Sequence, residues 1–249
     1  MAQYGPVASV ARALAVLDEL RDSADGLGVN ELARRIAVNP STASRLLATL
    51  ESAGMVQRDG QGPYRLGLSL VTLANRVLAR LDVQVLARPV LVELMERTGE
   101  TSTLSLPGER EAITVDSAPS RSSVVSMARL GQPSIAHATA VGKVMLAFGG
   151  DPLPRERDLI ALTDRTITDR ATLSTEIATV RERGYGTVFG ERDADVNAIA
   201  APVWGREDRL AAILGIQGPA NRLEDPAMLL PVLHEEAGKL TRALGGDAT

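Results

Sequence analysis

Apolar residues in the first third of the chain recur at helical spacing in three short blocks. The first block predicts a helix over residues 9–21 and consists of Val10, Ala13, Leu14, Leu17 and Leu20. The second block predicts a shorter helix with an inward face of Leu32, Ala33 and Ile36. A break at residues 37–39 separates it from the third block, so two short helices are joined by a tight turn.

The third block predicts a helix with two chemically different faces. Asn39 is a favourable N-cap, and Pro40 suits the first helical position, where its missing N–H removes no hydrogen bond. At about 100° per residue, one face is apolar and consists of Ala43, Leu46, Leu47 and Leu50. The opposite face carries small and hydroxyl side chains and one arginine: Ser41, Ser44, Arg45, Ala48 and Ser52, with Thr42 and Thr49 at its edges.

A short hairpin follows this helix, with its tip at residues 59–62 and an arginine on either side. Helix, turn, helix and hairpin in this order are typical of proteins that place one helix in the major groove of DNA. Small residues allow close approach, hydroxyls contact phosphates or base edges, and arginine pairs with guanine. An ordinary amphipathic helix with a solvated face would explain the third helix alone. The order of elements favours DNA contacts from Ser41, Thr42, Ser44, Arg45, Thr49, Arg58 and Arg65.

The hydrophobic pattern changes after the hairpin, where residues 68–82 predict a connecting helix. Its apolar stripe consists of Leu70, Leu73, Ala74, Val77 and Leu81. An apolar stripe on a connector indicates pairing with a second copy, which gives a two-fold dimer with two DNA-reading heads. The alternative is that the stripe packs against the chain's own domains.

Residues 83–249 mix helical and strand patterns, as in a single α+β domain. Helices are expected over 83–98, 141–148 and 172–183, and extended segments at 101–106, 112–116, 123–127, 185–189, 199–204 and 210–217. A last helix from Pro226 places Leu233, Ala237, Leu240 and Leu244 on one face. We therefore expect a DNA-binding domain at 1–67, a linker helix at 68–82 and a ligand domain at 83–249.

Composition narrows the class of function. The 249-residue chain carries a net charge of −4, yet residues 1–80 hold nine Arg against seven Asp and Glu, and local positive charge permits DNA binding. The lack of cysteine excludes disulfides, thiolate catalysis and the usual zinc frameworks, and the two histidines argue against a histidine metal site. The sequence shows neither an apolar run of membrane-spanning length nor a signal peptide, so a cytoplasmic protein without cofactor or metal is expected.

The sequence offers no convincing catalytic set. Residues 137–143, HATAVGK, resemble the end of a phosphate-binding loop, but His137 replaces the first glycine and Val144 follows Lys143. No GxSxG motif is present, and neither His137 nor His234 has a Ser or Asp partner that the sequence can justify. We therefore expect the C-terminal domain to bind a ligand and not to catalyse a reaction. The alternatives are an enzyme with an accessory DNA-binding head, and a ligand-independent DNA-binding protein whose C-terminal domain serves only oligomerisation.

Together these features resemble the IclR family of bacterial transcription regulators, over about residues 7–244. The matching motifs are VARAL in the first helix, STASRLLATL in the third, YRLG closing the hairpin, HATAVGKVMLA, IAAPV at 199–203, and Gly218-Pro219. The resemblance implies a winged helix-turn-helix, a linker helix and a GAF-like effector domain. It also implies homodimers, often paired into tetramers, on a near-palindromic operator. Effectors in the family are commonly small organic acids, including aromatic catabolites, and members repress, activate, or do both.

The resemblance also implies an effector pocket, which falls here on Ser126, Ala140, Val141, Val188, Val196, Ala198, Gly215 and Gln217. Family members that bind small carboxylates tend to have Ser or Cys where Ala198 stands, an acidic residue near Val188, and Ser in place of Gly215. A buried carboxylate without enough hydrogen-bond donors is costly. We therefore expect a larger or more apolar effector, oriented chiefly by Gln217 and backbone amides.

Overall fold

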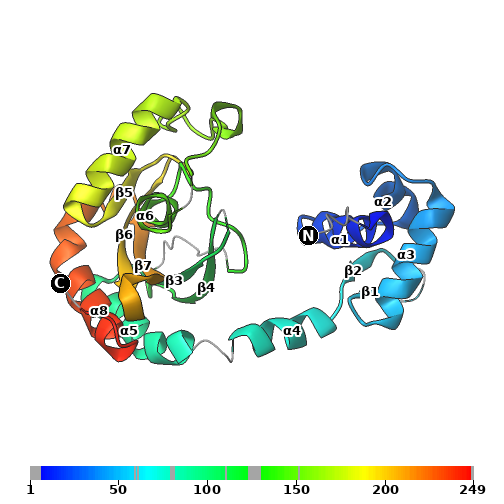
Figure 1. The fold of residues 1–249 in the computed structure, drawn as a ribbon, viewed down its shortest axis with the longest axis horizontal. Helices are drawn as coiled ribbons and strands as arrows, with labels where there is room; N and C mark the ends of the chain where they lie inside the picture. The colour runs from blue at the N-terminus through cyan, green and yellow to red at the C-terminus, as the bar shows by residue number, and fades with distance from the viewer. Residues whose placement is uncertain are drawn as a thin grey trace, which may run out of the picture. The chain divides into compact units, whose positions relative to one another are not determined.

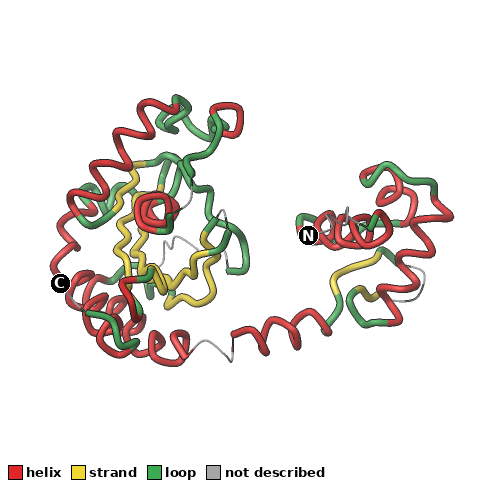
Figure 2. Tube along the Cα trace, in the orientation of Figure 1, coloured by secondary structure: helices red, strands yellow, loops and turns green. Residues whose placement is uncertain are grey.

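The computed structural model describes residues 7–58, 60, 62–78, 82–109, 111–122, 130–150 and 152–247. The chain divides into two compact units, Met1–Leu81 and Asp82–Thr249, whose elements are drawn in Figures 1 and 2. The connecting helix is therefore grouped with the N-terminal unit. No helix in the described ranges is long and apolar enough to cross a membrane.

The N-terminal unit is a three-helix bundle closed by a hairpin. Its elements are α1 (Ala8–Arg21), α2 (Val29–Arg35), α3 (Pro40–Ser52), β1 (Val56–Arg58), β2 (Tyr64–Leu66) and α4 (Ser69–Leu78). They enclose a core of Val16, Leu20, Leu27, Leu32, Leu47, Val56 and Tyr64. One difference from the sequence-based expectation is that Val10 and Leu14 on α1 are exposed, because only the C-terminal half of that helix reaches the core.

The turn between α2 and α3 is set by local chemistry. The side chain of Asn39 accepts a hydrogen bond of 2.8 Å from the backbone N–H of Thr42, and Pro40 occupies the first helical position, as predicted. Ala37 has a φ of 53°, in the left-handed region that favours glycine. The chain direction therefore reverses through a strained alanine, and the backbone N–H of Val38 bonds to the carbonyl of Ala33 at 2.9 Å.

Replacing Ala37 with glycine is expected to stabilise the N-terminal unit by about 0.5–1 kcal/mol. The strain of an alanine in this region is about 1–2 kcal/mol, and the greater freedom of glycine in the unfolded chain offsets part of that gain. A denaturant titration followed by circular dichroism measures the change. The matched control is Ala53→Gly. Ala53 follows α3 at an ordinary φ of −86°, so glycine relieves no strain there and this variant should be less stable than the parent. Equal effects of the two substitutions would contradict the strain at Ala37.

The C-terminal unit is built on a five-stranded antiparallel sheet in the order β4-β3-β7-β6-β5. Its strands are β3 (Thr101–Pro107), β4 (Ala112–Ala118), β5 (Gly186–Phe189), β6 (Val196–Trp204) and β7 (Leu210–Pro219). Its helices are α5 (Asp82–Thr98), α6 (Ala140–Phe148), α7 (Arg170–Arg183) and α8 (Leu230–Ala243), with 3-10 turns at Glu156–Asp158, Arg206–Asp208 and Pro226–Leu229. The strand expected at 123–127 falls outside the described residues.

Helices cover both sides of this sheet. Helix α6 packs against β6 and β7 and against α7, whereas α5 and α8 pack together and against β3 and β6. In Figure 1, α6 lies on the inner side of the curved sheet and α5 and α8 on its outer side. The predicted inward face of α8 is confirmed at Leu233, Ala237 and Leu240, which are buried. The ends of β5, β6 and β7 and the start of α6 therefore meet on one side of the sheet.

Candidate DNA-reading helix and ligand pocket

Helix α3 separates its two faces as predicted. Ala43 and Leu47 are fully buried, and Leu46 and Leu50 are partly buried. The opposite face is exposed along its length at Ser41, Ser44, Arg45, Ala48, Thr49 and Ser52, with Thr42 half-buried at its edge. An exposed face of small and hydroxyl side chains fits the close approach that base-edge contact in the major groove requires.

Arg45 differs from the neighbouring arginines of α2. Arg34 and Arg35 both bind Glu31, with N–O distances of 2.6 and 2.8 Å, and these hydrogen bonds lower the pKa of Glu31 to about 2. Within the part of the chain that the structure describes, the guanidinium of Arg45 makes no hydrogen bond or ion pair, although the backbone carbonyl of Arg45 accepts from the hydroxyl of Thr49 at 3.0 Å. Its guanidinium is therefore available to a partner outside the chain.

The hairpin arginines are held against the body of the unit. Arg58 lies 3.7 Å from a carboxylate oxygen of Glu51, and its guanidinium sits 4.9 Å from the ring centre of Tyr64. The Nε of Arg65 donates to the backbone carbonyl of Asp25 at 3.4 Å. The two positive charges thus lie on the two strands of the hairpin and are held by contacts within the unit. This arrangement suits contact with the phosphate backbone of DNA better than base recognition.

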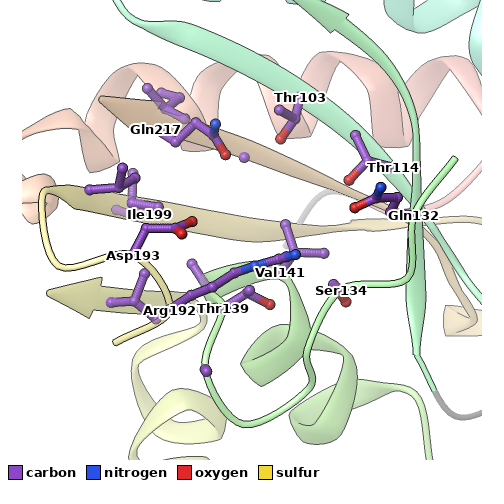
Figure 3. Close-up of a pocket in the computed structure, with 17 residues that line it drawn as sticks. Thr103, Thr114, Gln132, Ser134, Thr139, Val141, Arg192, Asp193, Ile199 and Gln217 are labelled. Carbon is purple, nitrogen blue, oxygen red and sulfur yellow. The ribbon is translucent and has the colours of Figure 1, made fainter. Parts of the chain in front are cut away.

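A pocket lies between α6 and the sheet of the C-terminal unit (Figure 3). Its empty volume is about 770 Å³, a figure that includes open solvent at its mouth. Seven of the eight positions taken from the family resemblance line it: Ala140, Val141, Val188, Val196, Ala198, Gly215 and Gln217. The eighth, Ser126, lies outside the described residues.

The pocket is more polar than the sequence suggested. Its lining also includes an arginine, an acid, an amide and four hydroxyls: Arg192, Asp193, Gln132, Thr103, Thr114, Ser134 and Thr139. Figure 3 shows these side chains arranged around the same space as Gln217. Gln217 and backbone amides are therefore not the only polar groups that line the pocket, and their part in orienting an effector stays a prediction. Apart from Thr139, which belongs to the HATAVGKVMLA motif, the additional groups come from strands β3 and β4 and from two loops that the family motifs do not cover.

The start of α6 gives the pocket a positive end. Thr139 caps the helix, its Oγ1 accepting from the N–H of Gly142 at 3.0 Å. The backbone N–H groups of Ala140 and Val141 have no partner inside the helix, and the helix dipole adds partial positive charge there. Gly142 is needed for this arrangement, because a Cβ at that position would lie 2.6 Å from the backbone of Ala136.

A buried hydroxyl at the pocket wall lacks a partner. Ser134 is 6% exposed, and its Oγ makes no hydrogen bond to any residue that the structure describes. Buried polar groups of this kind normally have a partner in the functional state. Gly215 keeps the opposite wall open, since a Cβ there would meet the Thr103 hydroxyl at 2.6 Å. Together with Arg192 and the start of α6, Ser134 gives the pocket the donors that an anionic ligand needs.

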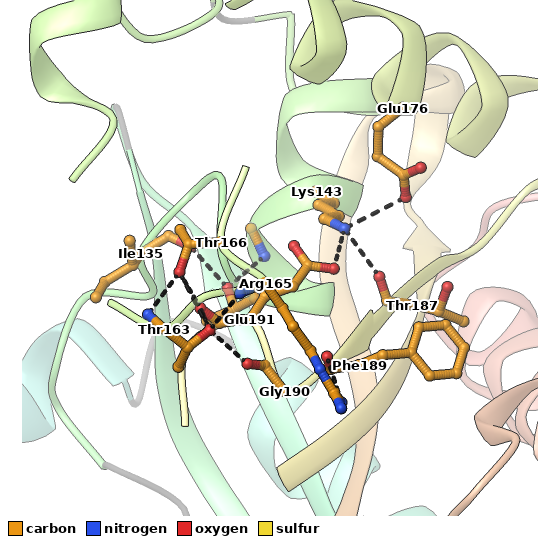
Figure 4. A network of polar contacts seen from close by, with 12 residues as sticks. Ile135, Lys143, Thr163, Arg165, Thr166, Glu176, Thr187, Phe189, Gly190 and Glu191 are labelled. Carbon is orange, nitrogen blue, oxygen red and sulfur yellow. Dashed lines mark hydrogen bonds and ion pairs between the residues drawn. The ribbon is translucent and has the colours of Figure 1, made fainter. Parts of the chain in front are cut away.

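The motif that resembled a phosphate loop has a different role. Lys143 is 2% exposed, and its ammonium reaches Glu191 at 2.7 Å, the carbonyl of Thr187 at 3.1 Å and Glu176 at 3.4 Å (Figure 4). Burial raises the pKa of Glu191, and the ammonium of Lys143 opposes that shift. The Nε2 of His137 lies 3.1 Å from the backbone carbonyl of Ile160, a contact that holds the buried imidazole in place. No group of His, Asp and Glu side chains in the described ranges could hold a metal ion.

Comparison with known proteins agrees with this architecture. The family model for the IclR helix-turn-helix domain matches residues 9–60, and that for the bacterial transcriptional regulator IclR C-terminal domain matches residues 75–242. The HTH-type transcriptional regulator XynR of Escherichia coli is 31% identical, covering 97% of this chain and 99% of its own.

Two solved structures extend the likeness to the fold. A putative IclR regulator from Silicibacter sp. is 30% identical with a TM-score of 0.81, covering 96% of this chain and 97% of its own. An IclR homologue from Microbacterium hydrocarbonoxydans, complexed with 4-hydroxybenzoate, is 25% identical with a TM-score of 0.79, covering 96% and 99%. With both domains matched along most of its length, the chain belongs to the IclR family of bacterial DNA-binding transcriptional regulators.

Proposed function

We propose that this chain binds an operator through the exposed face of α3 and changes its operator affinity when a small organic acid occupies the pocket of the C-terminal unit. It acts as a regulator and not as an enzyme. The observation that carries the proposal is the joint presence in one pocket of Arg192, the start of α6 and the Ser134 hydroxyl, which has no hydrogen-bond partner among the residues that the structure describes. A coupling of about 1–3 kcal/mol between the pocket and the operator is typical of such switches.

The pocket chemistry favours a carboxylic acid that also carries hydroxyl groups. The start of α6 and Arg192 suit a carboxylate, and the hydroxyls and Gln132 suit hydrogen bonds to hydroxyl groups. Apolar side chains such as Val141 and Val188 leave room for a ring or a carbon chain. The solved relative with 4-hydroxybenzoate supports this class, because that compound combines an acid with a hydroxyl.

A thermal-shift panel tests the effector class. Hydroxylated acids such as 4-hydroxybenzoate and gluconate are compared with neutral analogues, 4-hydroxybenzamide and glucose. A bound acid at 100 times its Kd should stabilise the protein by about 2.7 kcal/mol, whereas its neutral analogue should not. The acids that stabilise the protein are then added to a protein–operator complex, where they should change operator affinity. Equal stabilisation by the neutral compounds would contradict the anionic site. If none of the compounds changed operator affinity, the result would favour a ligand-independent regulator.

The hairpin arginines are proposed to contact phosphates. Arg65→Ala and Arg58→Ala should each lower the slope of log K against log salt by about 1 on operator and random DNA alike, since each removes one phosphate contact. Fluorescence anisotropy from 50 to 200 mM salt measures the slope. Arg21→Ala is the control, because Arg21 at the end of α1 binds Asp18 and Asp22. An unchanged slope for both hairpin variants would remove the hairpin from the DNA contact.

We also propose that the regulator is a homodimer, able to pair into a tetramer, on a near-palindromic operator. Exposed apolar side chains on and just before α4 support this, since Leu68, Val71 and Leu73 are each at least half exposed. Exposed apolar side chains can pack against a second copy of the chain, and a two-fold dimer presents two copies of α3 to the two half-sites of an operator. Analytical ultracentrifugation with and without operator duplex gives the assembly state.

A further inference from the structure

A buried, charge-balanced cluster lies behind the pocket. Lys143 of α6 uses all three ammonium protons, on Glu191, Glu176 and the carbonyl of Thr187. Arg183 of α7 also bonds Glu176, at 3.3 Å, and the hydroxyl of Thr187, at 3.1 Å. Two cations and two carboxylates therefore join α6, α7, β5 and the segment after β5 into one network, and Figure 4 shows its part around Lys143.

The segment after β5 is tied down at its base by this network and by a neighbouring turn. The backbone carbonyl of Glu191 accepts from the hydroxyl of Thr166 at 2.6 Å, and that of Gly190 accepts from Thr163 at 2.7 Å. The N–H of Gly190 bonds the carbonyl of Val196 at 3.0 Å, which closes the loop. Residues 190–196 therefore form a short loop with a fixed base.

The position of this loop determines one wall of the pocket. Glu191 points its side chain to Lys143, and the next residues, Arg192 and Asp193, line the pocket. Lys143 belongs to the same helix whose first residues, Ala140 and Val141, also line the pocket. The Lys143–Glu191 ion pair thus connects the two parts of the pocket lining that would hold the anionic part of a ligand.

This ion pair is poorly suited to stabilising the fold. Glu191 is 7% exposed, and one of its carboxylate oxygens has no hydrogen-bond partner among the described residues. The desolvation of two charges often exceeds their mutual attraction, so well-packed apolar residues at such a site can be equally or more stabilising. A buried pair that contributes little to stability can still select one conformation of the segments that it joins.

We propose that Lys143 and Glu191 are positioning residues, which fix the loop that carries Arg192 at a set distance from the start of α6. The pair acts on ligand binding through the loop and not by contact with the ligand. Its importance for effector affinity rests on the proposed function, whereas its control of the loop does not. An intact ion pair keeps the pocket preorganised before any ligand arrives.

Amide hydrogen exchange without ligand tests the inference on the full-length protein. In Lys143→Met/Glu191→Leu, the amides of Gly190 and Val196 should exchange at least about ten times faster than in the parent, while β7 keeps its protection. The melting temperature should stay level or rise, because two buried charges are replaced by apolar groups of similar size. A purely stabilising pair would instead lower the melting temperature and speed exchange throughout the unit.

A spectroscopic readout follows the same loop. The chain has no cysteine, so a nitroxide on Ala194→Cys labels the exposed part of the loop alone. Its spectrum should sharpen in the double variant. The matched control is Arg97→Met/Glu236→Leu, which removes another ion pair with a buried carboxylate, between α5 and α8. That control should leave the exchange of 190–196 and the label spectrum unchanged.

The overturning result is a folded double variant whose loop is as protected and as immobile as in the parent. If the double variant does not fold, Glu191→Gln, which keeps the side-chain volume, is measured in the same way and should still exchange at least about three times faster. Neither readout uses an effector. The positioning role can therefore be contradicted while the proposed effector binding stands, and effector binding can be contradicted while the positioning role stands.

Discussion

Arg45→Ala is expected to reduce operator affinity by about 5- to 150-fold and to leave binding to random DNA nearly unchanged. A bidentate arginine–guanine pair is worth about 1–3 kcal/mol of base discrimination, which corresponds to this range. Arg45 is exposed near the start of α3, and its guanidinium makes no hydrogen bond or ion pair within the described residues, so its removal should not disturb the fold. Anisotropy titrations compare an operator obtained by in vitro selection with a shuffled duplex of equal length at one salt concentration.

Arg34→Ala is the matched control for Arg45→Ala. Arg34 is 73% exposed on the preceding helix, but its charge is paired with Glu31, so its loss should change neither affinity by more than about twofold. Unchanged melting curves for both variants show that the fold is intact. Equal losses on operator and shuffled DNA for Arg45→Ala would assign Arg45 to a phosphate contact and leave base recognition to the hydroxyl side chains of α3.

The DNA-reading unit could be predicted from the sequence because its determinants are local. Asn39 and Pro40 specify the start of α3 within two adjacent residues, and the period of its leucines specifies which face is buried. Helix α1 is predictable only in part. Its helical spacing predicts the helix, but periodicity does not show how far along its length a helix meets the core, and Val10 and Leu14 are exposed.

The pocket was only half predictable, for a reason that lies in the sheet order. Residues of β5, β6 and α6 could be placed there from motifs near them in the chain. Thr103 and Thr114 line the pocket because β3 pairs with β7 and β4 pairs with β3. The alternation of side chains along a strand does not show which strands lie beside it in the sheet. Arg192 had one usable signal, since a charged cluster follows directly after a buried strand, at a place where ligands often contact loops.

Lys143 shows how a local pattern can mislead. Glycine followed by lysine at the start of a helix is the pattern of a phosphate-binding loop, in which the lysine reaches the ligand. Here the lysine points away from the helix start and is buried among Glu191, Glu176 and Thr187. Nothing in the neighbouring sequence indicates those partners, which lie 33 to 48 residues further along the chain. Long-range charge pairing of this kind requires the fold.

Ala198→Trp is expected to abolish the effector response, with at least about a 100-fold increase in the effector concentration needed. Ala198 lies near the start of β6, paired with Val188 on one side and Gln217 on the other, and all three line the pocket. An indole at this position would occupy the space of the ligand. Operator titrations with increasing amounts of a stabilising acid from the thermal-shift panel measure the response.

The melting temperature and operator affinity of Ala198→Trp without effector should remain within a few degrees and about threefold of the parent, because α3 lies in the other compact unit. Ala178→Trp adds the same indole to the exposed side of α7 and should respond normally. If Ala198→Trp released operator at the parental effector concentration, the ligand would bind outside this pocket, and Arg192 and the start of α6 would lose their proposed role. If Ala198→Trp instead lost the effector response but still bound the operator, ligand sensing would be separable from DNA recognition. One side chain that fills the pocket would then remove ligand sensing without affecting DNA binding.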